Sequence, residues 1–262
     1  MTNPAPALTL RPMQLIAPTD LTAFRKVESW IFDLDNTLYP SECNLFAQID
    51  QRMGAFLAEF FGVSLPEAWR IQKDYYYRYG TTLAGLMAEH KLPPERFLDY
   101  VHDIDLAPVC EAPALGAAIE RLPGRKYIFT NGSRRHAERV AEKLGVLHLF
   151  DEVFDIVAGD YVPKPSPEAY DRFLKAHGLT PRTGAMFEDI PHNLEAPHAL
   201  GMATVLVRST FIDHPSQQAI AEWRALPPHI HHITADLTGF LQDALAAIDK
   251  RVPNTPRKSR SG

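Results

Sequence analysis

The sequence predicts an α/β protein, a doubly wound (Rossmann-like) parallel sheet with an all-helical segment inserted after its first strand. Two observations predict this fold. Short apolar runs that suit buried strands alternate with stretches whose apolar residues fall at helical spacing, and such alternation implies right-handed crossovers within one parallel sheet. Residues 43–108 interrupt the alternation, because they show helical spacing throughout. We therefore expect an open sheet covered by helices, with a helical insert.

The first predicted strand ends on two carboxylates. Residues 1–26 show no sustained periodicity and are expected to form an irregular lead-in. The segment WIFDLDNTLYP, residues 30–40, then begins as the apolar run of a buried strand over Ser29–Asp33. Asp33 and Asp35 follow one residue apart. Like charges at the end of a buried strand repel each other, so this pair indicates that a positive group lies against it.

The segment after Pro40 is predicted to be a small bundle of helices. Apolar residues of segment 46–60 share one helical face, and Gly62 ends that helix. Three further helices are expected, one following Pro66 and two over Leu83–His90 and Pro94–Val101.

From residue 109 onward the pattern alternates. We expect strands over Lys126–Phe129, Glu152–Val157, Ala185–Phe187, Ala203–Val207 and Ile230–Ile233. We expect helices over Ala114–Leu122, Arg134–Leu144, Pro167–His177, Asn193–Leu200 and Asp236–Ala247, the last one capped by Thr234. The core would then comprise residues 27–42 and 109–248. The basic tail, residues 249–262, contains prolines and is expected to be disordered.

Composition narrows the class of function. The chain has 262 residues, a net charge of −5 and a pI near 6.1, so no global basic field indicates a nucleic-acid partner. No apolar run approaches the roughly 20 residues that span a membrane. The two cysteines, Cys43 and Cys110, are expected to be free thiols of a cytoplasmic protein. The oligomeric state stays open.

Polar groups follow several predicted strands at the point where each strand ends. Asp33 and Asp35 follow the first strand, Thr130-Asn131-Gly132 another, and Glu188-Asp189 a third, while Lys164 lies in a loop beyond a strand. Ligands of open α/β sheets bind at the carboxyl ends of the strands, so we expect these groups to meet although they are far apart in sequence.

The charges of these groups suggest a reaction. Four carboxylates in one crevice require a divalent cation, and hard oxygen ligands suit Mg²⁺. Lys164, the Thr130 hydroxyl and the N–H groups of Asn131 and Gly132 would bind phosphate oxygens. One carboxylate can attack phosphorus to form an aspartyl-phosphate, and a second can move the protons.

Each group alone also has a structural interpretation. An Asp-x-Asp pair after a strand is often a turn or a helix cap, and Thr130-Asn131-Gly132 also suits a capping turn. Lys164 alone suits a solvated surface, and Glu188-Asp189 alone suits a helix start. Their recurrence at successive strand ends favours a catalytic site. The histidines, by contrast, are interpreted as structural or surface residues, because neither His231 and His232 nor His192 and His198 share a face.

These residues resemble the four motifs of the haloacid dehalogenase superfamily of phosphohydrolases. Asp33-x-Asp35-x-Thr37 is similar to the first motif, Thr130-Asn131-Gly132 to the second, Lys164 to the third and Glu188-Asp189 to the fourth. The resemblance implies that Asp33 is the nucleophile and a Mg²⁺ ligand. It implies that Asp35 is the general acid/base, with its backbone carbonyl on the metal. Asp189 would be a further metal ligand, with Glu188 assisting through water, and residues 43–108 would be the helical cap.

A narrower resemblance is to the pyrimidine 5'-nucleotidase-like branch. Similar segments are Tyr79–Leu86 and Val101–Ile104 of the insert, His136–Val140 after the second motif, and Phe187–Ile190 with Asn193-Leu194 at the fourth. The resemblance implies hydrolysis of UMP or CMP to nucleoside and phosphate. The sequence departs from many members at Asn193, where they carry a further acid.

Other functions stay open at this point. The alternatives are a phosphatase of pyridoxal phosphate or a sugar phosphate, a phosphomutase and a non-catalytic binding protein. Asp35 argues against dehalogenation, which does not need a second acid/base. Tyr79, where a helix gives way to Gly80, has two interpretations: it packs against neighbouring side chains like most aromatic residues at helical spacing, or, as a hypothesis, it reaches the cleft and stacks on a base.

Overall fold

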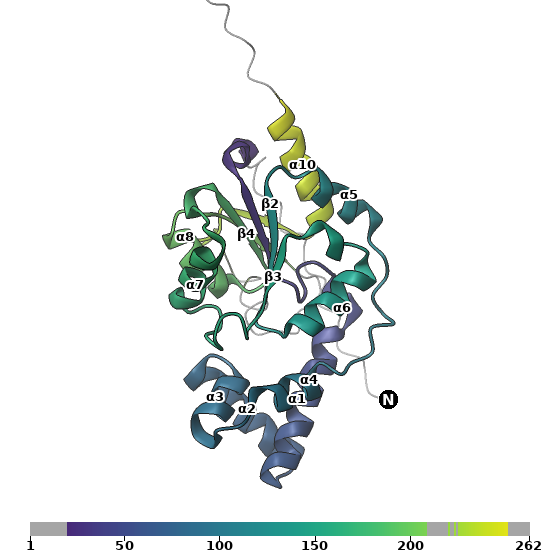
Figure 1. Cartoon of the computed structure of the whole chain (residues 1–262), viewed down its shortest axis with the longest axis vertical. Helices are drawn as coiled ribbons and strands as arrows, with labels where there is room; N and C mark the ends of the chain where they lie inside the picture. Colours follow the sequence, from purple (N-terminus) through teal and green to yellow (C-terminus); the bar gives the residue numbers. More distant parts are fainter. Residues whose placement is uncertain (1–19, 209–219, 221–222, 224, 251–262) are drawn as a thin grey trace, which may run out of the picture.

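The computed structural model describes residues 20–208, 220, 223 and 225–250. At its centre lies a six-stranded sheet in the order β3-β2-β1-β4-β5-β6, with every neighbouring pair parallel (Figure 1). The strands are β1 Ser29–Phe32, β2 Arg125–Phe129, β3 Glu152–Phe154, β4 Gly184–Glu188, β5 Ala203–Val207 and β6 His232–Thr234. The chain starts in the middle of the sheet and winds first to one edge and then to the other, which confirms the predicted doubly wound fold.

Helices cover both faces of the sheet. Alternate residues of β1 enter different apolar clusters, Trp30 and Phe32 on one face and Ile31 on the other. The first cluster is covered by α5 Pro113–Arg121, α6 Arg134–Leu144, α10 Leu237–Asp249 and the 3-10 helix η1 Leu21–Lys26. The second is covered by α7 Pro167–His177 and α8 Glu195–Ala199. The strands are therefore buried on both faces, as their near-continuous apolar sequences predict.

A second group of helices stands apart from the sheet. It consists of α1 Leu45–Phe61, α2 Leu65–Tyr79, α3 Thr82–His90 and α4 Pro94–Val101, and we call it the helical unit (Figure 1). Gly62 ends α1 in the left-handed conformation, with φ +66°. No helix in the described part of the chain is both long enough and apolar enough to cross a bilayer.

Some element boundaries differ from the prediction. The third strand is shorter than expected and ends at Phe154. The expected helix 193–200 is split into the 3-10 helix η5 Pro191–Leu194 and the short α8. The last strand begins two residues late, at His232, and Asp236 rather than Thr234 caps α10, because its side chain accepts the Gly239 N–H. The remaining 3-10 helices are η2 Ser41–Cys43, η3 Leu147–Leu149 and η4 Pro181–Thr183.

The described part of the N-terminal lead-in is ordered. The expected irregular lead-in contains the ordered helix η1, whose Phe24 is fully buried and packs against Trp30 and Phe240. Residues 1–19 and 251–262, which hold the rest of the lead-in and nearly all of the basic tail, lie outside the described residues.

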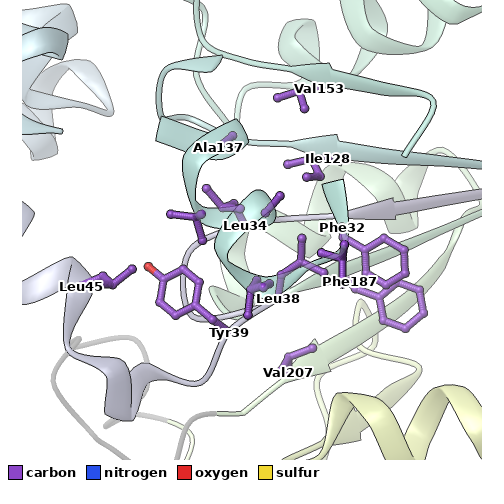
Figure 2. Close-up of a cluster of buried hydrophobic side chains, with 14 of the residues drawn as sticks. Phe32, Leu34, Leu38, Tyr39, Leu45, Ile128, Ala137, Val153, Phe187 and Val207 are labelled. Atoms are coloured by element: carbon purple, nitrogen blue, oxygen red, sulfur yellow. The ribbon is translucent and has the colours of Figure 1, made fainter. Parts of the chain in front are cut away.

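The loop after β1 is shaped by apolar contacts that direct its carboxylates away from the core. Leu34, Leu38 and Tyr39 are buried in the same apolar cluster as Phe32 and Phe187 (Figure 2). The ladder between β1 and β4 continues one residue further, since the Asp33 N–H donates to the Phe187 carbonyl at 2.9 Å. Anchoring of Leu34 in the core leaves the flanking residues, Asp33 and Asp35, free to line a cavity above the strand ends.

Candidate active site

The carboxyl ends of the strands open into a cavity of about 650 Å³ beneath the helical unit. The site residues predicted on the core all line it: Asp33, Asp35, Thr130, Asn131, Gly132, Lys164, Glu188 and Asp189. β1 and β4 are neighbours at the point where the winding of the sheet reverses, so their end residues are brought together there. The opposite wall comes from α1, α2, α4 and the start of α3.

Lys164 places a positive group against Asp33, the first carboxylate of the pair that follows β1. Its ammonium group is buried and donates to Asp33 Oδ1 at 2.7 Å, to Glu188 Oε1 at 2.8 Å and to the Phe129 carbonyl at 2.8 Å. Burial alone would lower the pKa of Lys164, but the two carboxylates raise it above the usual lysine value. Lys164 therefore stays charged and ties the ends of β1 and β4 together.

The acidic groups outnumber this one lysine. Asp33, Glu188 and Asp189 place one carboxylate oxygen each within 4.8 Å of one another. Burial raises the pKa of Asp33 to about 7, against the pull of Lys164 and with a contribution from Glu188. Burial and the neighbouring Glu188 also raise the pKa of Asp189 well above its usual value. A bound cation would relieve this repulsion, so the donor set of hard oxygens fits a divalent metal ion.

Asp35 lies in a different environment from Asp33. Its Oδ1 accepts hydrogen bonds from the Tyr39 hydroxyl at 2.7 Å and from His136 Nε2 at 2.8 Å. Burial alone would raise the pKa of Asp35, but His136 and Tyr39 together lower it. Burial and Asp35 in turn raise the pKa of Tyr39, so its hydroxyl keeps its proton and remains a donor. Two neighbouring aspartates thus have opposite pKa shifts, which is typical of a divided acid/base role.

Sequence reasoning gave no role to Tyr39 or His136. Tyr39 lies four residues after Asp35 in the same loop, and that short spacing was the available signal. His136 follows the Thr130-Asn131-Gly132 segment at the start of α6 and is fully buried. It stacks on His102 with ring centroids 4.5 Å apart, and His102 Nδ1 lies 3.0 Å from the Ser133 hydroxyl.

The second predicted group shapes the loop as well as the cavity. The Asn131 side chain donates to the Lys164 carbonyl at 3.0 Å and accepts the Lys164 N–H at 2.8 Å, so it fixes the backbone that carries the lysine. The Gly132 N–H, predicted to bind phosphate, instead donates to Thr130 Oγ1 at 2.9 Å. Because Thr130 Oγ1 accepts that bond, its own O–H remains available to donate into the cavity.

Glu188 is held on several sides. Besides the Lys164 ammonium, its Oε1 accepts the Asn193 amide at 2.6 Å, and its Oε2 accepts the Ile190 N–H at 2.8 Å. These contacts explain the departure at Asn193, because an acid there would face Glu188 without a donor. Asn193 itself is buried, and its carbonyl accepts the Tyr170 hydroxyl at 2.5 Å. With three donors on it, Glu188 suits a supporting position behind the metal ligands.

The hypothesis that Tyr79 reaches the cleft needs correction. The Tyr79 hydroxyl donates to Glu89 Oε1 at 2.7 Å, and its ring packs against Tyr75, on the side of α2 that faces α3. Tyr79 is not among the residues that line the cavity, whereas Tyr76 and Tyr77 are. The reason is the rotational position of α2, which turns residues 72, 73, 76 and 77 toward the cavity and residues 75 and 79 away from it.

Within the described part of the chain, the remaining histidines and both cysteines are not part of the cavity lining. His231 Nδ1 accepts the Thr204 N–H at 3.1 Å, while His232 packs against Phe24. Cys43 is half-buried and Cys110 is exposed, and both are free thiols. Burial, together with the neighbouring Cys110, raises the pKa of Cys43.

Comparison with known proteins agrees with this fold. Residues 30–201 match the model of a family described as haloacid dehalogenase-like hydrolases. Phosphate metabolism protein 8 of Saccharomyces cerevisiae is 27% identical over 200 residues, which cover 70% of this chain and 61% of that protein. The chain thus matches less than two thirds of the length of this relative. The 2-deoxyglucose-6-phosphate phosphatase 2 of the same yeast is 27% identical over 207 residues, covering 71% of this chain and 81% of that enzyme.

Solved structures show the same fold at lower sequence identity. A HAD phosphatase from Thermococcus onnurineus superposes with a TM-score of 0.55 at 17% identity, covering 84% of this chain and 99% of that one. The L-2-haloacid dehalogenase from Xanthobacter autotrophicus gives a TM-score of 0.50 at 14% identity, covering 82% and 97%. The fold is therefore shared by enzymes that break different bonds.

Proposed function

Because this chain belongs to the haloacid dehalogenase-like hydrolases, we propose that it is a Mg²⁺-dependent phosphomonoester hydrolase. The observation that carries the proposal is the contrast between two aspartates that line one cavity. Asp33 lies within a group of carboxylates that suits a cation, and Asp35 is held apart from it by Tyr39 and His136. The names of the two yeast relatives, a phosphate metabolism protein and a sugar-phosphate phosphatase, support phosphate chemistry.

The residues divide the metal and phosphate sites between them. Asp33, Asp189 and the backbone carbonyl of Asp35 would hold Mg²⁺, with Glu188 behind them. When bound, the ion would offset the negative charge of the phosphate group. Thr130 would donate to a further phosphate oxygen. Lys164 would meet the phosphate by exchanging one of its three acceptors, Asp33, Glu188 or the Phe129 carbonyl, for a phosphate oxygen. Lys164 also neutralises part of the carboxylate charge, so that an anionic substrate can enter.

The reaction would proceed in two displacements. In the first, a carboxylate oxygen of Asp33 attacks phosphorus, the ester P–O bond breaks, and Asp35 gives a proton to the leaving oxygen. The bound phosphate dianion favours that protonated form, because a neighbouring negative charge raises the pKa of a carboxyl group. In the second, water attacks the phosphorus of the aspartyl-phosphate, Asp35 takes the proton of that water, and the bond to Asp33 breaks.

The site supports phosphate hydrolysis better than dehalogenation. A dehalogenase needs the nucleophile but not a second acid/base group, whereas here two side chains hold Asp35 in place. A phosphomutase would need a further acid/base residue, and a non-catalytic binding protein would not need to retain all the charged groups. Among the residues that the structure describes, each charged group of the four motifs lines the cavity.

For the substrate, we propose a nucleoside 5'-monophosphate, with UMP and CMP preferred. The similarity of the Tyr79–Leu86 and Val101–Ile104 segments to the pyrimidine 5'-nucleotidase-like branch supports this choice. A cavity of about 650 Å³ accommodates a ligand larger than a simple sugar phosphate. The second candidate is a phosphatase of sugar phosphates or pyridoxal phosphate, which the yeast 2-deoxyglucose-6-phosphate phosphatase favours.

Phosphate release tests both levels of the proposal. The substrates are UMP, CMP, AMP, GMP, pyridoxal phosphate and sugar phosphates, each with Mg²⁺ and with EDTA. We expect release that requires Mg²⁺ and disappears in Asp33→Asn. The control is Asp171→Asn, an exposed aspartate of α7 that pairs with Lys175 and should leave the rate unchanged. Activity that survives Asp33→Asn would contradict the mechanism, and a clear preference for a sugar phosphate would contradict the nucleotidase assignment.

A further inference from the structure

The helical unit contributes a polar group to an otherwise apolar part of the cavity wall. The apolar side chains that line this part come from α1, α2, α4 and the start of α3: Phe46, Ile49, Met53, Tyr76, Leu83, Phe97, Leu98 and Val101. Three polar residues lie together among them, Asp50 of α1 and the adjacent Gln72 and Lys73 of α2, and the hydroxyl residues Thr81 and Thr82 line the cavity at the start of α3. The phosphate chemistry described above, which takes place at the core end of the cavity, uses none of the three.

Asp50 is held in place by a buried amide. The side chain of Gln72 is buried, and its Nε2 donates to Asp50 Oδ1 at 2.7 Å and approaches Met53 Sδ at 3.7 Å. Lys73 Nζ lies 3.8 Å from the same Oδ1. The Asp50 side chain is nevertheless 38% exposed. Its carboxylate is therefore oriented by one neighbour, adjoins a positive one, and retains accepting capacity.

A purely structural role does not account for this arrangement. A hydrogen bond between Asp50 and Gln72 does tie α1 to α2. That tie would work as well on the outer surface, where a carboxylate stays hydrated. Here the carboxylate lines a cavity with apolar walls. When a ligand fills the cavity, the carboxylate loses its hydrating water, which is costly unless the ligand itself donates a hydrogen bond to the carboxylate.

The surroundings indicate which kind of ligand would do so. The hydroxyl groups of a sugar point in many directions, and each needs a polar partner. A planar heterocycle buries both of its apolar faces and needs polar partners only along its edge. The edge of a nucleobase carries an N–H donor next to a carbonyl or ring-nitrogen acceptor. One carboxylate beside one ammonium group, within apolar walls, matches this edge, because the carboxylate can accept from the N–H and the ammonium group can donate to the acceptor.

We propose that Asp50, oriented by Gln72 and flanked by Lys73, selects nucleoside monophosphates by accepting a hydrogen bond from an N–H group of the base. Lys73 donates to the adjacent acceptor of the base. This inference rests on the proposed phosphatase function. It adds the part of the substrate that is recognised and the residues that recognise it.

Matched substrates separate base recognition from phosphate chemistry. Ribose 5-phosphate is UMP without its base, and p-nitrophenyl phosphate reports the phosphate chemistry alone. We expect the wild type to have a higher kcat/KM for UMP than for ribose 5-phosphate. Asp50→Ala should lower kcat/KM for UMP roughly ten- to hundredfold, as expected for the loss of one hydrogen bond to a charged group. The values for ribose 5-phosphate and p-nitrophenyl phosphate should change by less than about twofold, because neither offers an N–H group.

Two more variants distinguish loss of base recognition from a change in the structure of the helical unit. Asp50→Asn keeps an oxygen that accepts the Gln72 amide but removes the charge, so its loss for UMP should be smaller than that of the alanine variant. Asp74→Ala is the matched control, since Asp74 lies on α2, pairs with Arg78 and is not among the cavity residues. It should behave like the wild type with every substrate.

Several results would overturn the inference. An equal loss in Asp50→Ala for UMP, ribose 5-phosphate and p-nitrophenyl phosphate would show a general defect instead of base recognition. An unchanged UMP value would show that Asp50 does not contact the base. Preference of the wild type for 2-deoxyglucose 6-phosphate, with a loss in Asp50→Ala for that substrate, would assign Asp50 to sugar hydroxyls. These results leave the phosphatase function standing, whereas a wild type inactive on all four substrates would remove both proposals.

Discussion

The Tyr39 hydroxyl provides the sharpest test of how the site controls Asp35. Replacing Tyr39 by Phe removes one of the two hydrogen bonds to Asp35 Oδ1, the one at 2.7 Å, and leaves the 2.8 Å bond from His136. The ring of Tyr39 is buried in the apolar cluster around Phe32 and should keep its packing in the variant (Figure 2). The change therefore acts mainly on the charge state of Asp35.

The size of the effect follows from the lost bond. A hydrogen bond to a charged group contributes about 1.5–3 kcal/mol, and 1.36 kcal/mol corresponds to one pKa unit. Tyr39→Phe should therefore raise the pKa of Asp35 by roughly one to two units from its lowered value. Asp35 takes a proton from water in the second displacement, so a higher pKa means that this step begins to work only at higher pH.

The assay is the pH dependence of kcat with p-nitrophenyl phosphate, whose leaving group departs without a proton. The rate then reports hydrolysis of the aspartyl-phosphate, and its acidic limb should move up by about one to two pH units in Tyr39→Phe. The control is Tyr161→Phe, whose lost hydroxyl donates to Glu95 at 3.3 Å and lies away from the cavity. An acidic limb that coincides with that of the wild type would refute the assigned role of Tyr39.

Three further predictions concern stability and metal binding. Asn193→Asp replaces the amide that donates to Glu188 by a buried carboxylate. We therefore expect the unfolding free energy of the metal-free protein, measured by urea titration, to fall by about 3 kcal/mol or more. An unfolding free energy equal to that of the wild type would contradict this expectation. Between about pH 4 and 7 the folded metal-free protein holds a proton on Asp33 that the unfolded chain releases, so its stability falls as the pH rises through this window. Mg²⁺ must displace the proton on Asp33, and this competition is weaker at pH 8 than at pH 6. The rise in Tm on adding Mg²⁺ should therefore be larger at pH 8. Equal rises at the two pH values would argue against Asp33 as a ligand. Gly85→Ala would place a Cβ 2.4 Å from the Tyr75 ring, between α2 and α3. This overpacking should lower the free energy of unfolding by about 1–3 kcal/mol, measured by thermal unfolding. An unchanged Tm would show that the helical unit rearranges to accept the extra methyl group.

The sequence by itself determined the fold and the chemical groups of the site. Periodicity depends on residues close together in the chain. It located the helices α1, α6 and α7 and the described strands other than β3 to within a residue or two, whereas β3 ends three residues earlier than expected. The rule that parallel strands present their carboxyl ends at one edge then predicts from the sequence alone that Asp33, Lys164 and Asp189 lie together. The candidate catalytic residues follow the ends of the strands, and the local sequence pattern shows where the strands end.

Only the tertiary structure decided which neighbours act on these groups. His136 contacts Asp35 across 101 positions of sequence, and this contact depends on where the tertiary structure places the start of α6 relative to the loop after β1. The orientation of α2 directs Tyr76 to the cavity instead of Tyr79, because the rotation of a helix is set by what it packs against. Gln72 and Asp50 meet for the same reason, across the interface between α1 and α2. The sequence of a helix shows which of its residues form the apolar face. Where that face lies relative to the cavity depends on how all the helices pack together.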